Sequence, residues 1–349
     1  MIWPGNKILV ISRYGFVKNF GPKSQYVQIK RENVEEDSEL HKLQDANALR
    51  VVHLSDLQGA SFGVNNIELL KKIYDAKPHL IVFTGDLVDR RMQVSKDFEA
   101  TIEFTRKLRE IAPTFFSYGN HELAFSASTV ENLRVRLENA GVVVLDGGSH
   151  IESVQFPAVN NGEIPNATAA KIGNKSGEQI EDMKFLSAHF EEIPNATAAK
   201  DKGLRSENVK VLLTGFPERL LMVEGKNRTK KNSDVDVEAL NFAIEEIKQK
   251  RSESRCDVSI LLAHEPQFLV EYAAANYDFI FSGHAHGGQI RLPIFGGLFS
   301  PGQGIFPKLT SGVHRAGDGK MIISRGLGNS SFPIRLFNRP EIILAEIQI

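Results

Sequence analysis

The 349-residue chain has a single cysteine, Cys256, which excludes an internal disulfide and any metal site built from several thiolates. It also lacks a surplus of charge, because 42 Lys and Arg residues balance 43 Asp and Glu residues. A near-neutral chain has no basic excess for binding a polynucleotide, so a nucleic-acid platform is disfavoured. The remaining composition, with 42% apolar and 24% charged residues, is that of a soluble globular protein.

Long apolar runs are missing as well. The longest near the start of the chain covers residues 8–11, far short of the roughly 20 residues that a membrane-spanning helix needs. It also lacks the longer apolar centre of a secretory signal. Together with the single cysteine, this favours a cytoplasmic protein without a transmembrane segment. A position at the membrane periphery, and an N-terminal anchor that has been removed, are the alternatives.

The chain divides into segments of different pattern. Residues 1–48 are poorly patterned, and we expect an N-terminal extension with an edge strand near 26–30. Regular structure is expected to begin at Leu49 and to form one domain over residues 49–349. Within that domain the segment EIPNATAAK occurs twice, at 163–171 and at 192–200. Two copies of so short a unit cannot stack into a solenoid, so we interpret residues near 157–206 as a surface insertion.

Five short apolar runs, rich in β-branched residues, each end at a polar residue of a kind that binds metal. Such runs are typical of strands buried on both faces. Helical patterns lie between several of them, at 66–76, 98–111, 129–140 and 237–251, and this alternation indicates an α/β fold. The polar residues at the strand ends are Asp56, Asp86, Asn120 with His121, His264, and His284 with His286.

These strand ends carry the chemistry. Ligand sites of α/β folds lie outside the carboxyl ends of the strands, so we expect the polar side chains to meet. Two carboxylates, one amide and three imidazoles suit two closely spaced divalent ions. Two ions about 3.5–4 Å apart lower the pKa of a bridging water and stabilise charge on phosphoryl oxygens during in-line attack. His121, beside Asn120, is the candidate general acid for the leaving oxygen.

A structural role is the usual explanation for a single histidine or aspartate at a strand end. Five ends of matching chemistry are not explained in that way, and we therefore favour the metal site. His53 and His79 lie within or before apolar runs, and we interpret both as structural.

The motifs resemble those of the calcineurin-like metallophosphoesterase superfamily, whose pattern is D-x-H, G-D-x-x-D-R, G-N-H-[ED], H and G-H-x-H, in that order. This chain reads DLQ at 56–58, GDLVDR at 85–90, GNHE at 119–122, His264, and GHAH at 283–286. The blocks GHAHGGQIRLP at 283–293, SRGLGN at 324–329 and PIRLFNRPE at 333–341 resemble the bacterial branch of YkuE-type phosphoesterases. That branch includes phosphohydrolases and, in some lineages, pyrophosphatases of lipid precursors.

The resemblance implies a four-layer α/β/β/α sandwich of two mixed β-sheets flanked by helices. It implies that His121 stays outside the ligand set and that Asp89 and Arg90 have supporting roles. The ligands it implies are Asp86 bridging both ions, Asp56 and His286 at the first site, and Asn120, His264 and His284 at the second.

This chain departs from the family at Gln58, where the pattern has a first-site histidine. A glutamine carbonyl oxygen is a weaker donor than an imidazole for borderline metals. Three hypotheses follow: an active enzyme whose first site prefers Mn or Mg, a slow enzyme with one tightly held ion, or an inactive scaffold for a protein partner. The presence of the other ligands and of His121 argues against the third. We expect two divalent ions, with Mn favoured over Fe, Zn or Mg.

The sequence is least informative about the substrate. We predict hydrolysis of a phosphodiester, phosphomonoester or pyrophosphate in a small molecule such as a lipid or a nucleotide. Arg291, Arg325 and Asn329 lie in Gly-containing loops and are candidates to bind the substrate phosphate, with a fold-stabilising role as an equal alternative. Residues 292–301 fit either an apolar lip for a lipid tail or, as we favour, a loop packed in the core.

Overall fold

The computed structural model describes residues 8–19, 25–34, 48–92, 94–156, 208–222, 235–292, 295–329 and 334–349. The chain forms two compact units, Met1–Ser153 with Lys210–Ile349, and Val154–Val209. The architecture below is that of the first unit. Both copies of the nine-residue repeat, and residues 157–206 as a whole, lie outside the described residues, so the surface insertion stays a prediction.

The first large sheet has seven strands in the order β2-β1-β17-β3-β4-β5-β6. The predicted apolar runs form the parallel strands β3 (Ala48–Leu54), β4 (Leu80–Thr84) and β5 (Thr114–Ser117), and β6 (Val143–Val144) pairs in parallel with β5. β17 (Glu341–Gln348) pairs antiparallel with β3 and parallel with β1 (Val10–Asn19), and β2 (Gln25–Val34) forms the edge.

The expectation that regular structure begins at Leu49 is wrong, because β1 and β2 precede it in the same sheet. The segment predicted as an edge strand lies within β2. Strand β1 has no clear apolar run, since Ser12 and Arg13 interrupt it. Both side chains are nevertheless buried, because they bond to carboxylates of the distant strand β17. Arg13 Nη2 lies 2.7 Å from Glu346 Oε1 in a buried ion pair. Only folding brings these two ends of the chain together, so the local pattern could not indicate the strand.

The second large sheet has six strands in the order β15-β16-β10-β9-β8-β7. Strands β8 (Asn208–Gly215), β9 (Val258–Leu262), β10 (Phe279–Ser282) and β16 (Gly319–Ile323) run parallel. β15 (Gly312–Ala316) pairs antiparallel with β16, and β7 (Ser149–Gln155) ends the sheet on the other side.

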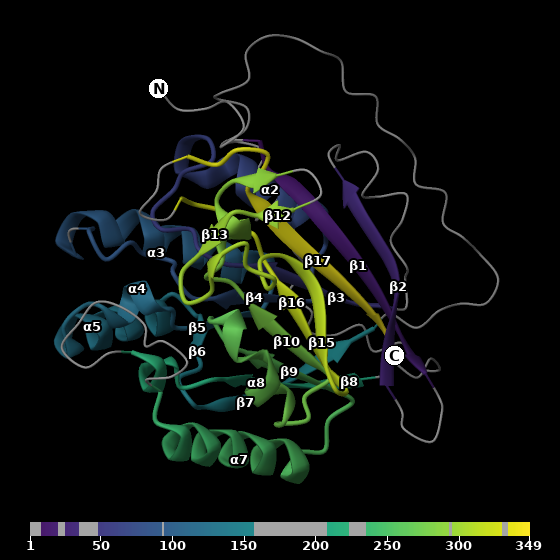
Figure 1. Cartoon of the computed structure of the whole chain (residues 1–349). Coiled ribbons are helices and arrows are strands. Elements are labelled where there is room, and N and C mark those ends of the chain that lie inside the picture. The colour runs from purple at the N-terminus through teal and green to yellow at the C-terminus, as the bar shows by residue number, and fades with distance from the viewer. Residues whose placement is uncertain are drawn as a thin grey trace, which may run out of the picture. The chain divides into compact units, whose positions relative to one another are not determined.

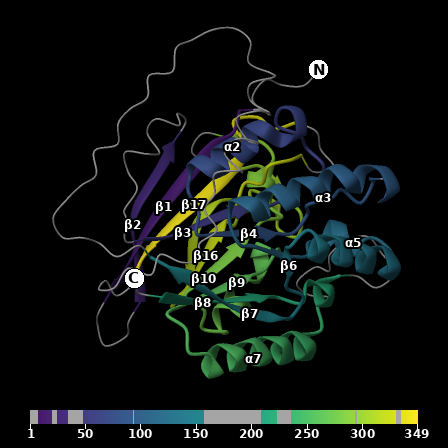
Figure 2. The same cartoon turned by 180° about the vertical axis from the view of Figure 1, so that it is seen from behind.

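Helices cover the outer face of each sheet. Apolar residues of α2 (Ile67–Asp75), α3 (Val94–Ile111) and α5 (Ala127–Asn139) share a core with the first sheet (Figure 2). Those of α7 (Val237–Glu253) and α8 (Leu269–Ala273) share one with the second sheet (Figure 1). The inner faces meet at ring contacts such as Phe16 with Phe279, whose centroids lie 4.9 Å apart. The predicted α/β/β/α fold class is confirmed.

Two histidines outside the predicted site have structural contacts. His53 Nε2 lies 2.7 Å from Thr84 Oγ1, and its ring packs edge-on against Phe281 of the second sheet. His79 Nδ1 accepts the backbone N–H of Arg50 at 3.0 Å. Among the described residues, no helix combines the length and the apolar character needed to cross a bilayer.

Candidate metal centre

The turns after the parallel strands bring the predicted side chains together, and all of these side chains are buried. The first sheet contributes residues after β3, after β4, and in α4 (Asn120–Leu123), which follows β5. The second sheet contributes residues after β9 and β10, including η6 (His286–Gly288). In chain order they are Asp56, Gln58, Asp86, Asn120, His121, His264, His284 and His286.

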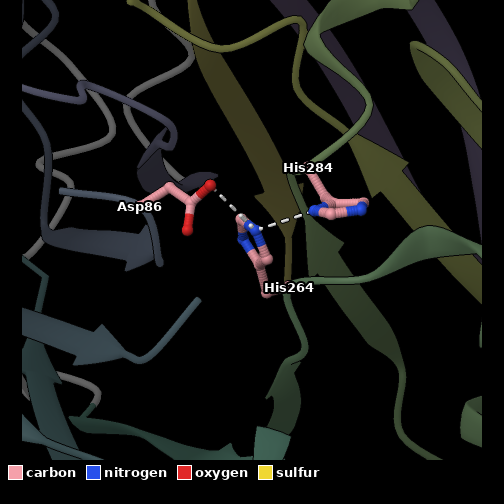
Figure 3. Close-up of side chains that lie close together, drawn as sticks. All are labelled: Asp86, His264 and His284. Atoms are coloured by element: carbon pink, nitrogen blue, oxygen red, sulfur yellow. Dashed lines mark hydrogen bonds and ion pairs between the residues drawn. The ribbon is translucent and has the colours of Figure 1, made fainter. Parts of the chain in front are cut away.

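One group, here the second triad, consists of Asp86, His264 and His284, whose ligand atoms lie within 4.8 Å of one another (Figure 3). His264 Nε2 lies 3.4 Å from Asp86 Oδ2 and 3.2 Å from His284 Nδ1. Asn120 adds its Oδ1, 2.9 Å from His284 Nδ1. His264 Nδ1 donates to the carbonyl oxygen of Thr84 at 2.7 Å, which leaves a lone pair on Nε2 in the neutral ring. This is the tautomer that a metal ligand requires.

The other group, here the first triad, consists of Asp56, Asp86 and His286, again within 4.8 Å. His286 Nε2 lies 3.3 Å from Asp56 Oδ1. Gln58 reaches the same place, since its Nε2 lies 3.0 Å from Asp86 Oδ2 and 3.3 Å from His286 Nε2. Within the described chain its Oε1 has no hydrogen-bond partner, and a half-turn of the amide exchanges the two atoms. Asp86 is shared by both triads.

The backbone is strained where it presents these side chains. Asp56, Asp86 and His284 have φ values of +54°, +55° and +64°. This left-handed region is unfavourable for residues other than glycine, and such strain persists where the surrounding structure holds it. A Cβ on Gly119 would overlap the carboxylate of Asp86, and one on Gly283 would overlap that of Asp56. The glycines of the motifs therefore make room for the carboxylates.

Glu122 was not assigned a role from the sequence, although it stands in the GNHE block. Its Oε2 accepts the backbone N–H groups of Asp86 at 2.8 Å and Gly119 at 2.9 Å, and its Oε1 accepts that of Val88 at 3.0 Å. One buried carboxylate thus joins the turn after β4 to the turn after β5. Burial raises the pKa of Glu122, and the negative charge of Asp86 adds to the effect.

Arg335 stands in the PIRLFNRPE block but was given no role from the sequence, because it follows no apolar strand and is not a metal ligand. The side chain is 1% exposed. Its Nε donates to the carbonyl oxygen of Gly328 at 3.0 Å, its Nη1 donates to that of Arg325 at 2.8 Å, and its Nη2 lies 3.3 Å from His286 Nδ1. Burial lowers the pKa of Arg335 to about 10, so the group stays charged at neutral pH. A fixed positive charge therefore lies beside the first triad.

The carboxylates of the centre differ in charge state. Burial raises the pKa of Asp56 to about 7, although His264 partly opposes this. Burial also acts to raise the pKa of Asp86, but His121 and His264 outweigh it and hold that pKa well below its usual value. Burial lowers the pKa of His284 to about 3. The shared carboxylate is therefore ionised, as a bridging metal ligand must be.

His121 lies beside the shared carboxylate. Its backbone N–H donates to Asp86 Oδ1 at 2.9 Å, and its Nε2 lies 3.9 Å from Asp86 Oδ2. Its Nδ1 accepts the backbone N–H of Arg90 at 3.3 Å and lies 3.9 Å from Asp89 Oδ1. The neutral ring therefore carries its hydrogen on Nε2, the nitrogen on the side of the metal centre.

The predicted substrate-binding residues lie outside both triads. Arg291 Nη1 donates to the carbonyl oxygen of Gly287 at 3.0 Å, and Arg325 Nη2 pairs with Glu341 Oε1 at 3.0 Å. Asn329 is half-buried. Both guanidinium groups thus have partners within the protein, which fits the fold-stabilising alternative, and their binding of substrate stays a prediction.

The sequence model of the family described as calcineurin-like phosphoesterase matches residues 49–288, a range that contains every residue of both triads. The chain belongs to this family. It is therefore a metal-dependent hydrolase of phosphoric esters. The family uses a dinuclear divalent centre, and the two triads are the candidate ligand clusters for it among the described residues. Carboxylate, amide and imidazole donors suit ions such as Mn, Fe or Zn, so the donor set fits such a centre.

Several relatives are similar to this chain, three of which are described here. The uncharacterized metallophosphoesterase YkoQ of Bacillus subtilis (strain 168) is 21% identical over 299 residues, which cover 86% of this chain and 83% of YkoQ. The phosphodiesterase YaeI of Escherichia coli (strain K12) is 21% identical over 308 residues, covering 87% and 83%. The uncharacterized metallophosphoesterase YkuE of Bacillus subtilis (strain 168) is 38% identical over 84 residues, covering 24% and 29%. The last match is local, so it supports the YkuE-type branch over about a quarter of the chain.

Proposed function

We propose that this chain hydrolyses a phosphodiester, phosphomonoester or pyrophosphate bond of a small substrate at a centre of two divalent ions, with Mn favoured. The observation that carries the proposal is the membership of Asp86 in both triads, because one carboxylate can then bridge two ions. When bound, such ions polarise phosphoryl oxygens and lower the pKa of a bridging water. Asp56, Gln58, Asp86 and His286 would hold the first ion, and Asp86, Asn120, His264 and His284 the second.

His121 is the proposed general acid. The backbone N–H of Arg90 occupies Nδ1, so the transferable proton is on Nε2. In the imidazolium form Nδ1 would also carry a hydrogen, and that hydrogen would face Asp89 Oδ1, which lies 3.9 Å from Nδ1. Burial raises the pKa of Asp89, but hydrogen bonds from Arg91 outweigh this and keep the carboxylate ionised. In the proposed step the imidazolium form of His121 gives its Nε2 proton to the leaving oxygen as the ester bond breaks, and the ring is left neutral.

The first experiment tests for turnover itself. Purified protein is assayed with Mn²⁺ and bis(4-nitrophenyl) phosphate, beside His284→Ala as the matched inactive variant. We expect clear hydrolysis by the wild type and a loss of at least about 100-fold in the variant, more than the loss usual for a residue that only supports a ligand. Equal rates for the two proteins would refute the enzymatic proposal.

A second experiment isolates the role of His121. For an alkyl ester, whose leaving alkoxide needs a proton, His121→Asn should lower kcat on the order of 10²–10⁴-fold. For a 4-nitrophenyl ester, whose leaving group is stable as an anion, the loss should be much smaller, and the bound metal should be unchanged. Equal losses on both esters would contradict the assignment of a general acid.

The second candidate function is a catalytically weak, metal-binding scaffold for a protein partner. Two observations at the first triad favour it, the amide of Gln58 and the buried charge of Arg335. Metal analysis of protein purified without chelator separates the two candidates. A single tight ion and no gain of activity with added Mn²⁺ would favour the scaffold.

A further inference from the structure

Two small hairpins near the metal centre expose large apolar side chains. β11 (Arg291–Leu292) pairs with β12 (Gly296–Gly297), and β13 (Phe299–Ser300) pairs with β14 (Gly304–Ile305), outside the two large sheets (Figure 1). The side chains, here called the apolar lip, are Phe295 (70% exposed), Phe299 (48%), Ile305 (71%) and Phe306 (53%). The expectation that residues 292–301 pack in the core is therefore wrong for Phe295 and Phe299.

The four side chains of the apolar lip form two pairs, which follow one another in the chain at Ile305 and Phe306. The ring centroids of Phe295 and Phe306 lie 6.2 Å apart. Phe299 stands directly opposite Ile305 in the antiparallel pair, so their side chains lie on the same face. Contiguous exposed apolar patches are uncommon on soluble proteins and mark surfaces that bind something.

Two aromatic residues in this region have a strained backbone conformation. Phe306 has a φ of +53°, and its N–H donates to the carbonyl oxygen of Leu298 at 2.9 Å. Phe337, which is 72% exposed, has a φ of +54° and follows Leu336, whose backbone bridges to Ile290. A bulky residue adopts this conformation only where the surrounding structure imposes it.

The apolar lip is built on a turn of the metal centre. The N–H of Leu298 donates to the carbonyl oxygen of Gly288 at 3.1 Å. Gly288 belongs to η6, which begins with the ligand candidate His286. A Cβ on Gly288 would overlap the backbone of Gly297, so the turn and the hairpins are in close contact. Whatever the apolar lip binds is therefore held close to the metal centre.

The charge of the region favours an anionic partner. Residues 289–311 and 334–340 contain no aspartate or glutamate. They contain Arg291, Lys308 and Arg339 in addition to the buried Arg335, and Lys308 is exposed. Exposed aromatic side chains beside basic residues are the composition of surfaces that enter the headgroup region of anionic membranes.

We propose that the apolar lip inserts into the surface of an anionic phospholipid membrane and thereby brings the metal centre to the interface. The aromatic rings enter the boundary between headgroups and acyl chains, and the exposed Lys308 lies among the phosphates. This goes beyond the proposed hydrolysis and does not depend on it, because membrane binding requires no turnover.

Vesicle co-sedimentation tests the proposal on the full chain. Wild-type protein should partition about tenfold more strongly into vesicles of equimolar phosphatidylcholine and phosphatidylglycerol than into phosphatidylcholine alone, and added NaCl should weaken the binding. Phe295→Ser with Phe306→Ser should lower partitioning about tenfold. The matched control is Phe242→Ser with Val270→Ser, which changes side chains 67% and 71% exposed on α7 and α8. That control should bind as the wild type does.

A charge pair completes the design. Lys308→Glu should weaken binding to the anionic vesicles, whereas Lys248→Glu, on α7, should not. Three outcomes would overturn the proposal: no binding by the wild type, equal losses in the apolar-lip and control variants, or self-association of the wild type that the apolar-lip variant abolishes. The last would identify a second copy of the chain as the occupant.

Discussion

The two halves of the metal centre share Asp86 but differ in what lies behind their histidines. In the second triad, the carbonyl oxygen of Thr84 accepts a hydrogen bond from Nδ1 of His264. In the neutral ring the lone pair is then on Nε2, where it can bind a cation. In the first triad, the Arg335 guanidinium, which can only donate, approaches Nδ1 of His286. The neutral His286 ring then carries its hydrogen on Nε2, the atom that a metal would need. The second triad thus has a histidine in the tautomer that binds a metal ion, whereas the first triad has the positive charge of Arg335 beside its histidine.

The electrostatics of the two halves differ at His264 and His286, whereas the pKa of His284, in the second triad, is lowered by burial as that of His286 is. Burial and the charge of Arg335 lower the pKa of His286 well below its usual value, which reflects an unfavourable environment for further positive charge. Burial also opposes positive charge at His264, but Asp86 and Asp56 outweigh it and raise that pKa well above its usual value. We therefore expect the two sites to differ in affinity, with the weaker site on the side of Gln58.

The largest expected effect comes from breaking the stronger half. His264→Ala removes the ligand whose tautomer is already set, so bound metal should fall below one ion per chain. Activity should drop at least about 100-fold, more than removal of a supporting residue usually costs. Metal analysis and turnover of bis(4-nitrophenyl) phosphate measure both effects. His79→Gln is the control, since His79 bonds to Arg50 and not to the centre; comparable loss in the control would refute the assignment.

A smaller effect is expected from strengthening the weaker half. Gln58→His supplies the imidazole found in the family pattern, and the affinity of the first site for Mn²⁺ or Zn²⁺ should rise about 10–100-fold. Calorimetric titration of metal-free protein should then show two tight binding steps in place of one. Gln58→Leu, which removes the oxygen, should weaken the first site further. A titration that is identical for all three proteins would show that position 58 does not ligate.

The next effect isolates the charge of Arg335. Arg335→Gln keeps a donor for the carbonyl oxygen of Gly328 and removes the positive charge, so first-site affinity should rise about fivefold, as expected for a charge a few ångströms from a solvated ion. Arg335→Lys retains the charge and should give no gain. Thermal unfolding of both variants checks that the hydrogen bonds of this segment survive. A gain in both variants, or in neither, would contradict the competition between guanidinium and metal.

The predicted fold is confirmed, and the candidate ligands do lie close together, because both predictions depend on local signals. A buried parallel strand appears as an apolar run, and its end appears as an abrupt polar residue, so Asp56, Asp86 and His264 could be found directly. Gln58 could be located because it occupies a motif position. These features need no knowledge of what lies opposite in space.

The features that the sequence did not indicate depend on contacts between distant segments. Arg335 lies 49 positions from His286 along the chain, in a loop without strand or helix periodicity. Arg13 looks like a solvent-exposed residue in the sequence, and only its pairing with Glu346 of β17 explains why it is buried. The exposure of Phe295 was also mistaken, because an apolar residue in a loop looks the same whether it faces the core or the solvent. Long-range pairing and exposure are tertiary properties, and a local pattern does not encode them.

The smallest effect on the metal centre is expected from substitution of His53. This substitution tests whether the difference between the two triads depends only on residues that line them. His53 stands three positions before Asp56, bonds to Thr84 and lies between the sheets, so His53→Gln should leave metal binding unchanged. Its effect should appear in stability. Burial lowers the pKa of His53 from 6.5 to about 3, so below pH 6.5 the unfolded chain takes up the proton first.

This group therefore lowers the free energy of unfolding of the wild type by about 1.4 kcal/mol per pH unit as the pH falls from 6.5 toward 3, and contributes no such loss above 6.5. His53→Gln does not titrate. When the pH is lowered from 7.5 to 5, the free energy of unfolding measured with urea should fall by about 2 kcal/mol more in the wild type than in the variant. Stability curves that stay parallel would mean that His53 is not buried as a neutral ring. A change in metal content would mean that the region between the sheets also contributes to the difference between the two triads.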